Sequence, residues 1–156
     1  MNTYHATFLR LFEPSTGGTQ LTVQNLYRQG PILQGGNSYQ FLDFTVDGLA
    51  STGNADGTEL TVNLPGLTAI STAADDALEE GWLAAVTVYR FEAAAPPDAP
   101  PAGQVTIIDT IGEVIGGGEE FPRSVTITIG SALETLGAQV PPRRFTTALV
   151  GTPCRL

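Results

Sequence analysis

LAAVTVYRFE (83–92) decides the fold class of this chain of 156 residues. Val86 and Val88 alternate with Thr87 and Tyr89, and a period of two is the pattern of a strand that buries one face. Further strands are predicted in HATFLRLF (5–12), TQLTVQNL (19–26), QFLDFTVDG (40–48), TELTVNLP (58–65), QVTIIDTIGEVIGGG (104–118), RSVTITIGSAL (123–133) and FTTALV (145–150). We therefore expect a mainly β barrel or sandwich.

A hairpin is predicted where two of these strands flank a loop. In QFLDFTVDG the apolar Leu42, Phe44 and Val46 share one face, so Asp43 and Asp47 fall on the polar face. The loop that follows ends in NADG, a strong turn signal, before the alternating strand TELTVNLP begins. These two strands should therefore pair with each other.

One short helix is predicted, over about residues 70–81, and should lie against the sheet. The hydroxyl of Ser71 or Thr72 can cap its start, because either can accept from the exposed amides of the first turn. Gly81 should end it. Packing of this helix on the sheet is the expected role of Trp82 and Tyr89 nearby.

Three segments read as connections. RQGPILQGGNS (28–38) is predicted to be a loop from its glycine, proline and asparagine content. AAAPPDAPPAG (93–103) should form a stiff, extended connection because proline fixes φ and removes an amide donor. GGGEEFP (116–122) is predicted to be a glycine-rich hairpin loop.

The charge balance excludes several partners. Sixteen acids against seven arginines, with no lysine, give a formal charge of −9. Nucleic-acid binding requires a basic surface, and anionic membranes attract basic segments, so neither partner is expected. No apolar run reaches the length of a membrane span, and the first residues lack the pattern of a signal peptide, so folding in a cytoplasm is expected.

Catalytic and phosphate-binding chemistry find little support. His5 is the only histidine, and no G-x-S-x-G motif surrounds a serine, so His5 is expected to be structural and the chain not to be an enzyme. GEVIGGG (112–118) lacks both a following helix and the Lys-Ser/Thr pair of a phosphate loop.

No metal or other cofactor is predicted. The predicted helix carries four acids, Asp75, Asp76, Glu79 and Glu80, which are expected to be solvated. Asp75 and Asp76 lie near its start, where a negative charge should interact favourably with the helix dipole. GNADG (53–57) resembles a fragment of a calcium loop without the remaining ligands and is read as a turn. Cys154 is the only cysteine and cannot complete a zinc or iron–sulfur site within one chain.

The C-terminal residues differ from the acidic remainder. We divide the chain into a body, 1–140, and an extended arm, 141–156. Pro141 and Pro142 stiffen the exit from the body, and Arg143 and Arg144 present guanidinium groups suited to carboxylates. Such an arm fits an acidic neighbouring subunit, and identical copies joined head to tail can close into a ring. The alternative is an ordinary last strand with two solvated arginines.

In its order of motifs the chain resembles the minor tail protein L family of tailed bacteriophages and related distal-tail or baseplate-hub proteins. TQLTVQNLY (19–27) is similar to an early family strand, and the acidic DDALEEGW (75–82) leads into AVTVYRF (85–91) as in the family. SVTITIGSALETLGAQVPPRRFTTALVGTPC (124–154) resembles the closing segment. The family's cysteine-rich iron–sulfur domain has no counterpart here.

The resemblance implies a tail-tube-like fold and a virion protein of the tail tip or baseplate, assembled in the host bacterial cytoplasm. Copies would form a ring, a trimer or hexamer, around the DNA conduit, and would contact tail-tube, hub and baseplate proteins. DNA would pass without specific binding, because an acidic lumen repels phosphates. The candidate lumen residues are Asp43, Asp47, Glu119 and Glu120, and the candidate subunit-interface residues are Pro141, Pro142, Arg143, Arg144, Phe145 and Arg155.

The alternative function is a carbohydrate- or receptor-binding β-sandwich accessory domain. Such a domain would need exposed aromatic side chains gathered on a loop face, since sugars stack on aromatic rings. The sequence has one tryptophan and four tyrosines without a visible cluster.

Overall fold

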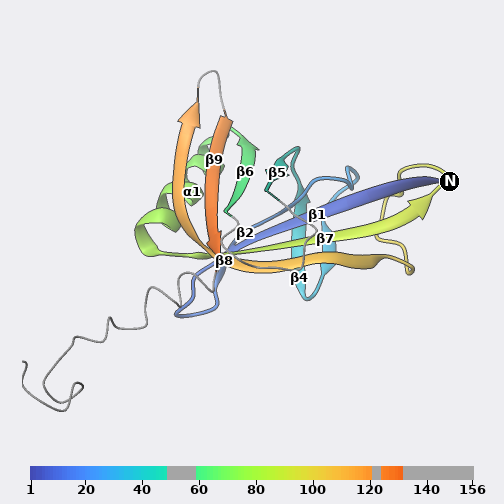
Figure 1. Cartoon of the computed structure of the whole chain (residues 1–156), viewed down its shortest axis with the longest axis horizontal. Coiled ribbons are helices and arrows are strands. Elements are labelled where there is room, and N and C mark those ends of the chain that lie inside the picture. Colours follow the sequence, from blue (N-terminus) through green and yellow to red (C-terminus); the bar gives the residue numbers. More distant parts are fainter. Residues whose placement is uncertain (49–58, 121–123, 132–156) are drawn as a thin grey trace, which may run out of the picture.

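Nine strands form one continuous mixed sheet, and one helix packs against it, so the mainly β prediction is confirmed (Figure 1). The computed structural model describes residues 1–48, 59–120 and 124–131. The strands follow the order β3-β4-β2-β1-β7-β8-β9-β6-β5 across the sheet. Their bounds are β1 Asn2–Phe12, β2 Thr19–Gln24, β3 Ile32–Gln34, β4 Asn37–Phe41, β5 Thr45–Asp47, β6 Leu60–Pro65, β7 Leu83–Ala93, β8 Val105–Glu120 and β9 Ser124–Ser131, with helix α1 at Thr68–Glu80.

Strand β8 joins the two halves of the sheet. It has 16 residues; the part from Val105 to Glu113 pairs with β7, and the part from Gly112 to Glu120 pairs with β9. Figure 1 shows β8 running beside β7 and then turning to run beside β9 and α1. The β8–β9 register shifts between Val114 and Gly116, and a bulge of this kind bends a strand. One strand therefore belongs to two differently oriented parts of the sheet.

Opposite faces of β1 and β7 are buried in two separate cores. Leu9 and Leu11 of β1, with Val86 of β7, face the larger core, which α1, β6 and β9 complete. The smaller core takes Phe8 and Phe91 from the opposite face and adds Ala6, Tyr27, Ile32 and Tyr39. In this core Phe8 meets Tyr39 edge to face at 5.0 Å and Tyr89 at 5.5 Å, which are favourable aromatic geometries. These central strands are thus covered on both sides.

The predicted loop 28–38 is wrong in part, because residues 32–41 form the β3–β4 hairpin. Ile32 pairs with Tyr39, and Gln34 pairs with Asn37. Gly35 and Gly36 make the turn with φ of 56° and 82°, and positive φ at both central residues is the conformation of a tight hairpin turn. The two glycines that suggested a loop are what allow the two short strands to pair.

Helix α1 begins earlier than predicted. Its N-cap is Leu67, which makes no side-chain cap, and the amide of Ser71 already donates to the Leu67 carbonyl at 2.9 Å. Ser71 and Thr72 therefore lie inside the helix and do not cap it. The first turn holds no acid, so Asp75 and Asp76 lie too far along to favour the helix dipole. The predicted end is confirmed, because Gly81 closes the helix in a left-handed conformation.

The prediction of a loop at 116–122 is also wrong. Gly116, Gly117 and Gly118 belong to β8 and pair with Thr128, Ile127 and Thr126 of β9. Strand β8 then continues to Glu120, and residues 121–123 lie outside the described residues. A Cβ at Gly117 would lie 3.2 Å from the Thr126 carbonyl oxygen of β9, so this glycine fits the close pairing of the two strands.

The predicted hairpin around residues 49–58 is confirmed in part, because the predicted strand 40–48 is divided between β4, which ends at Phe41, and β5, and only β5 pairs with β6. Thr45–Asp47 pairs antiparallel with β6, and Val46 faces Val62. Phe44 is buried in the larger core, while Leu42 and Val46 pack at its margin, as their shared face predicted. The loop itself lies outside the described residues.

A buried glutamine organises the turn that follows β2. Gln24 has no exposed surface, and its Oε1 accepts from the amides of Leu26 and Tyr27, each at 2.8 Å. Its Nε2 donates to the Tyr27 carbonyl at 2.6 Å. The neighbouring Asn25 accepts from the Thr7 amide at 2.9 Å. Gln24 therefore satisfies three backbone groups that burial would otherwise leave unpaired.

We expect Gly112→Ala to lower the free energy of unfolding by about 2–3 kcal/mol, because the added Cβ would overlap the Gly130 carbonyl oxygen and the Ile129 side chain. Urea unfolding followed by circular dichroism measures this. The matched control is Gly118→Ala, whose Cβ meets no atom within 4 Å and should change stability by less than about 0.5 kcal/mol. Equal stability of both variants would contradict the close approach at Gly112.

Gln24→Leu should lower the free energy of unfolding by about 3 kcal/mol, since two buried amides and one carbonyl lose their partner. Gln20→Leu is the matched control, because Gln20 is exposed on the same strand and should tolerate the change. Denaturant midpoints of the two variants and the wild type give the comparison. A stable Gln24→Leu variant would show that the turn forms without its side-chain partner.

Candidate functional site

The acidic and histidine side chains of the described residues are dispersed. Among them, no three histidine, cysteine, aspartate or glutamate side chains come close enough to hold a metal ion. His5 is exposed on β1, where its register partner on β7 is Arg90. In the same described ranges, no helix is long and apolar enough to cross a membrane.

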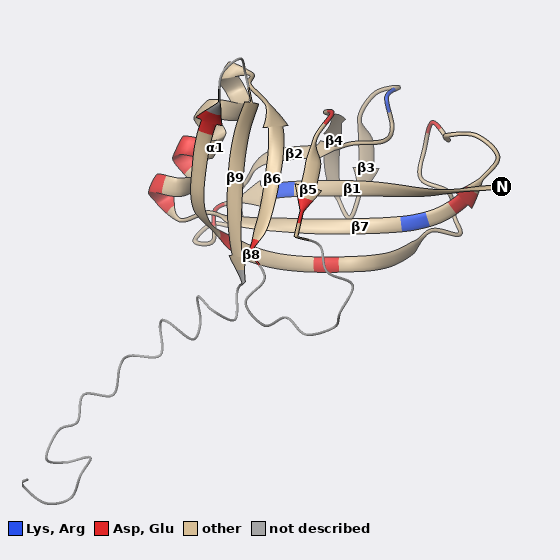
Figure 2. Ribbon diagram, turned by 45° about the horizontal axis from the view of Figure 1, so that its top comes forward, with Lys and Arg blue, Asp and Glu red and all other residues tan. Residues whose placement is uncertain are grey.

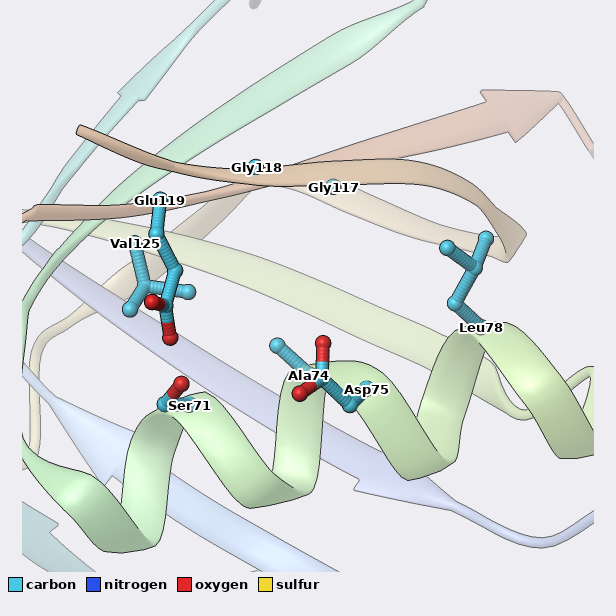
Figure 3. Close-up of a pocket in the computed structure, with 8 residues that line it drawn as sticks. All are labelled: Ser71, Ala74, Asp75, Leu78, Gly117, Gly118, Glu119 and Val125. Carbon is cyan, nitrogen blue, oxygen red and sulfur yellow. The ribbon is translucent and has the colours of Figure 1, made fainter.

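A shallow groove lies between α1 and the glycine run of β8. Figure 3 shows Ser71, Ala74, Asp75 and Leu78 of α1 facing Gly117, Gly118 and Glu119 of β8, with Val125 beside them. Its volume of about 60 Å³ is far below the roughly 300–1,000 Å³ of small-molecule sites. The groove has room for a side chain rather than for a cofactor. Two carboxylates, Asp75 and Glu119, border its apolar floor.

The predicted lumen acids whose side chains are described, Asp43, Asp47 and Glu119, do not form one cluster. Asp47 alternates with Val46 on β5 and accepts from Asn63 Nδ2 at 3.0 Å on the outer face of the sheet. Glu119 pairs with Val125, which is buried on the face that α1 covers. Strands β9 and β6 separate β8 from β5, a distance of about 14 Å at the usual strand spacing. The two residues therefore lie on opposite faces.

The other two lumen candidates are Asp43, whose side chain is described, and Glu120, whose side chain is not. Asp43 is exposed between β4 and β5. Glu120 is the last residue of β8, and its side chain lies outside the described part. A shared lumen position for all four acids stays a prediction.

The outer face of β5, β6 and β9 is lined by small polar side chains. Asn63 Oδ1 accepts from the Thr126 hydroxyl at 3.3 Å, while its Nδ2 donates to Asp47. The cross-strand bonds therefore run from β5 to β9 through one asparagine. Thr45, Thr61 and Thr128 lie on the same face by their register. This face is polar and bears Asp47, and none of the three described arginines belongs to it.

Strand β8 exposes a set of aliphatic side chains that sequence reasoning missed. Val105 is 55% exposed, Ile107 41%, Ile111 48% and Ile115 46%. Their β-branched shape predicted only that they belong to a strand. The only sign of this exposure in the sequence is the Ile107-Ile108 doublet, which breaks the alternation of apolar and polar residues. In the structure a bulge lies at Ile107, because Ile108 is opposite Val88 while Thr106 is opposite Tyr89.

The predicted interface residues 141–145 and Arg155 lie outside the described residues, as does Cys154. The described part nevertheless shows what they would complement. It holds fourteen of the sixteen acids and three of the seven arginines, a formal balance of 3 − 14 = −11. Residues 132–156 hold three arginines and one acid, a balance of 3 − 1 = +2. Acids on α1 and on several strands are visible in Figure 2.

The tryptophan and the four tyrosines are turned toward the two cores. Trp82 is buried in the larger core as expected, and its Nε1 donates to Glu80 Oε2 at 2.8 Å. Tyr27 and Tyr39 are buried in the smaller core, and Tyr4 and Tyr89 are half-buried against it. The prediction that Tyr89 packs the helix on the sheet is therefore wrong, because α1 contributes to the larger core on the opposite face of β7. All four tyrosines and the tryptophan lie within the described residues, and none of them has an exposed ring on which a sugar could stack.

No protein-family model matches the chain, and a search of curated proteins finds no similar sequence.

One buried hydroxyl has a measurable consequence. Tyr27 has no exposed surface, and its hydroxyl has no hydrogen-bond partner in the described structure. Desolvation raises the pKa of Tyr27 to about 12, because burial disfavours the phenolate. Burial likewise raises the pKa of Tyr39. Both hydroxyls stay protonated in the folded chain at a pH where an unfolded chain ionises.

We expect the protein to lose stability between about pH 10 and 12, since the unfolded state releases the Tyr27 proton near 10 and the folded state near 12. Below pH 10 this contribution is fully present. Tyr27→Phe should remove part of the alkaline loss and, by deleting an unpaired hydroxyl, should not lower stability at pH 7. Urea midpoints of both proteins at pH 8 and pH 11.5 test this; parallel losses would contradict it.

Proposed function

We propose that this chain is a structural, non-enzymatic subunit of a bacteriophage tail, at the tail tip or baseplate. Copies form part of a ring around the DNA conduit and link the tail tube to the hub. The observation that carries the proposal is the uneven distribution of charge: the described part has a formal charge of −11, and residues 132–156 have a formal charge of +2. Opposite charges at two ends of one chain favour association head to tail, and a head-to-tail contact with the right rotation closes a ring.

The mainly β fold with one packed helix supports the proposal, because it agrees with the fold that the tail-protein resemblance implies. The polar face that bears Asp47 supplies a surface suited to passing DNA. Its threonine and asparagine side chains are short and uncharged, and its carboxylate repels phosphate. Asp47 and Asp43 are the stronger lumen candidates, since Glu119 borders the groove beside α1.

The groove beside α1 supplies an acidic contact for a neighbour. Asp75 and Glu119 flank an apolar floor that includes Leu78, which is 44% exposed. A guanidinium group can bind such carboxylates while its methylene stem covers apolar surface. The predicted arm residues Arg143 and Arg144 have this chemistry.

The carbohydrate-binding alternative has no specific observation in its favour. Sugar stacking needs exposed aromatic rings, and the tryptophan and all four tyrosines are buried or half-buried. A glycan array with the purified chain would detect such binding directly.

We expect the double reversal Arg143→Glu/Arg144→Glu to weaken ring or tail assembly by about tenfold or more while the monomer stays folded, because attraction to acidic neighbours becomes repulsion. Electron microscopy and sedimentation of the full chain measure assembly, and circular dichroism measures folding. The matched control reverses two exposed arginines of the body, Arg28→Glu/Arg90→Glu. Normal assembly of the arm variant would defeat the proposed arm contact, and absence of the chain from purified tails by mass spectrometry would defeat the tail assignment.

A further inference from the structure

The first half of β8 has a partner strand on one side only. Residues 105–113 pair with β7, whereas β9 begins its pairing with β8 at Gly112. Among the described residues, Val105–Ile111 therefore has no strand on the side away from β7. Figure 1 shows this part of β8 running beside β7, clear of β9 and β6. An unpaired edge of this kind is a template for another strand.

The backbone direction at this edge follows from a neighbouring hydrogen bond. The amide of Val114 donates to the Trp82 carbonyl at 3.0 Å, on the β7 side. Amides along a strand point alternately to its two sides, and β7 pairs with β8 without a register shift from Ile108 to Glu113. The backbone amides and carbonyls of Asp109 and Ile111 therefore point away from β7, toward the open side.

The side chains along this edge are unusually apolar. Natural sheets protect open edges with charges, prolines or bulges. Here the bulge at Ile107 and the carboxylate of Asp109 are the protection, and Asp109 already accepts from the Thr87 hydroxyl at 3.2 Å. Ile107 and Ile111 on either side of Asp109 remain 41% and 48% exposed. The edge thus offers backbone hydrogen bonds, aliphatic contacts and one negative charge together.

The chain that follows β9 does not complement this edge in the existing register. Ser131 pairs with Gly112, so in a continued strand Ala132 would face Ile111 and Glu134 would face Asp109. Like charges directly opposite each other destabilise a strand pair. The segment FTTALV (145–150) lacks this conflict: it contains no acid, its residues favour a strand, and Arg143 and Arg144 precede it.

We propose that the open edge of β8 at Asp109–Ile111 receives the segment 145–150 of a second copy of this chain as an added strand. The inference rests on the proposed function, in which copies meet head to tail. Thirteen residues, 132–144, separate the segment from Ser131, and the two prolines at 141 and 142 form an extended spacer that carries it toward a neighbour. Backbone pairing provides affinity, and contact of Asp109 with Arg143 or Arg144 sets the position.

Sedimentation velocity of the full chain over a range of concentrations tests this inference. The wild type should self-associate, and Ile111→Lys should weaken association about tenfold or more, since an edge lysine blocks strand addition and repels the arginines. Leu33→Lys is the matched control, because Leu33 is 75% exposed on the edge strand β3 and should associate like the wild type. Circular dichroism verifies folding, and Ile107→Lys is the second variant if Ile111→Lys does not fold.

Mixing two full-length variants identifies the donor. Ile111→Lys blocks the edge, and Ala148→Pro blocks strand formation by the arm. Each alone should associate about tenfold more weakly than the wild type, and an equimolar mixture should form pairs in which the intact arm of one variant binds the intact edge of the other. A wild type that stays monomeric, a mixture that does not pair, or an Ile111→Lys chain that associates normally would overturn the inference.

These results are separable from the tail assignment. Association through this edge by a chain that mass spectrometry never finds in phage tails would leave the inference standing and defeat the tail assignment. Incorporation of Ile111→Lys into tails at the wild-type level would defeat the inference alone.

Discussion

The close approach of two backbones at Gly112 and Gly130 is the constraint on which the rest of the structure depends. No side chain fits there, because a Cβ on Gly112 would overlap the opposite carbonyl oxygen. Pairing with β9 begins at this point, and the bulge between Val114 and Gly116 follows directly. The same strand can therefore serve the extended β1–β7–β8 layer and the part of the sheet that carries α1.

Two consequences of this arrangement are linked. Burial on both faces of β1 and β7 anchors the centre of the sheet, because Leu9 and Val86 face one core while Phe8 and Phe91 face the other. Strand β9 follows only the second half of β8, which leaves the first half paired on one side among the described residues. A stable centre with an open margin is compatible with a subunit that acts through its neighbours.

The distribution of charge gives the proposed assembly a direction. The described part is strongly acidic, and the arginines concentrate after β9. Self-repulsion among acidic bodies would keep copies apart unless a cationic segment bridges them. The acids along α1 and the single carboxylate on the β8 edge offer two kinds of contact, one electrostatic and one combined with backbone pairing.

The sequence by itself determined the strongly alternating strands β1, β2, β6, β7 and β9, the end of the helix and which residues of 42–46 face the core, because these follow from local alternation and from Gly81. The sequence did not predict that Gly116–Gly118 lies within a strand or that Gly35-Gly36 closes a hairpin. Glycine adopts loop and strand conformations with similar ease, and only a partner strand selects one of them. Only the tertiary structure decided that Asp47 and Glu119 lie on opposite faces. It alone also showed that Ile107 and Ile111 stay exposed, because exposure depends on which strands lie alongside β8 and not on the residues of β8 themselves.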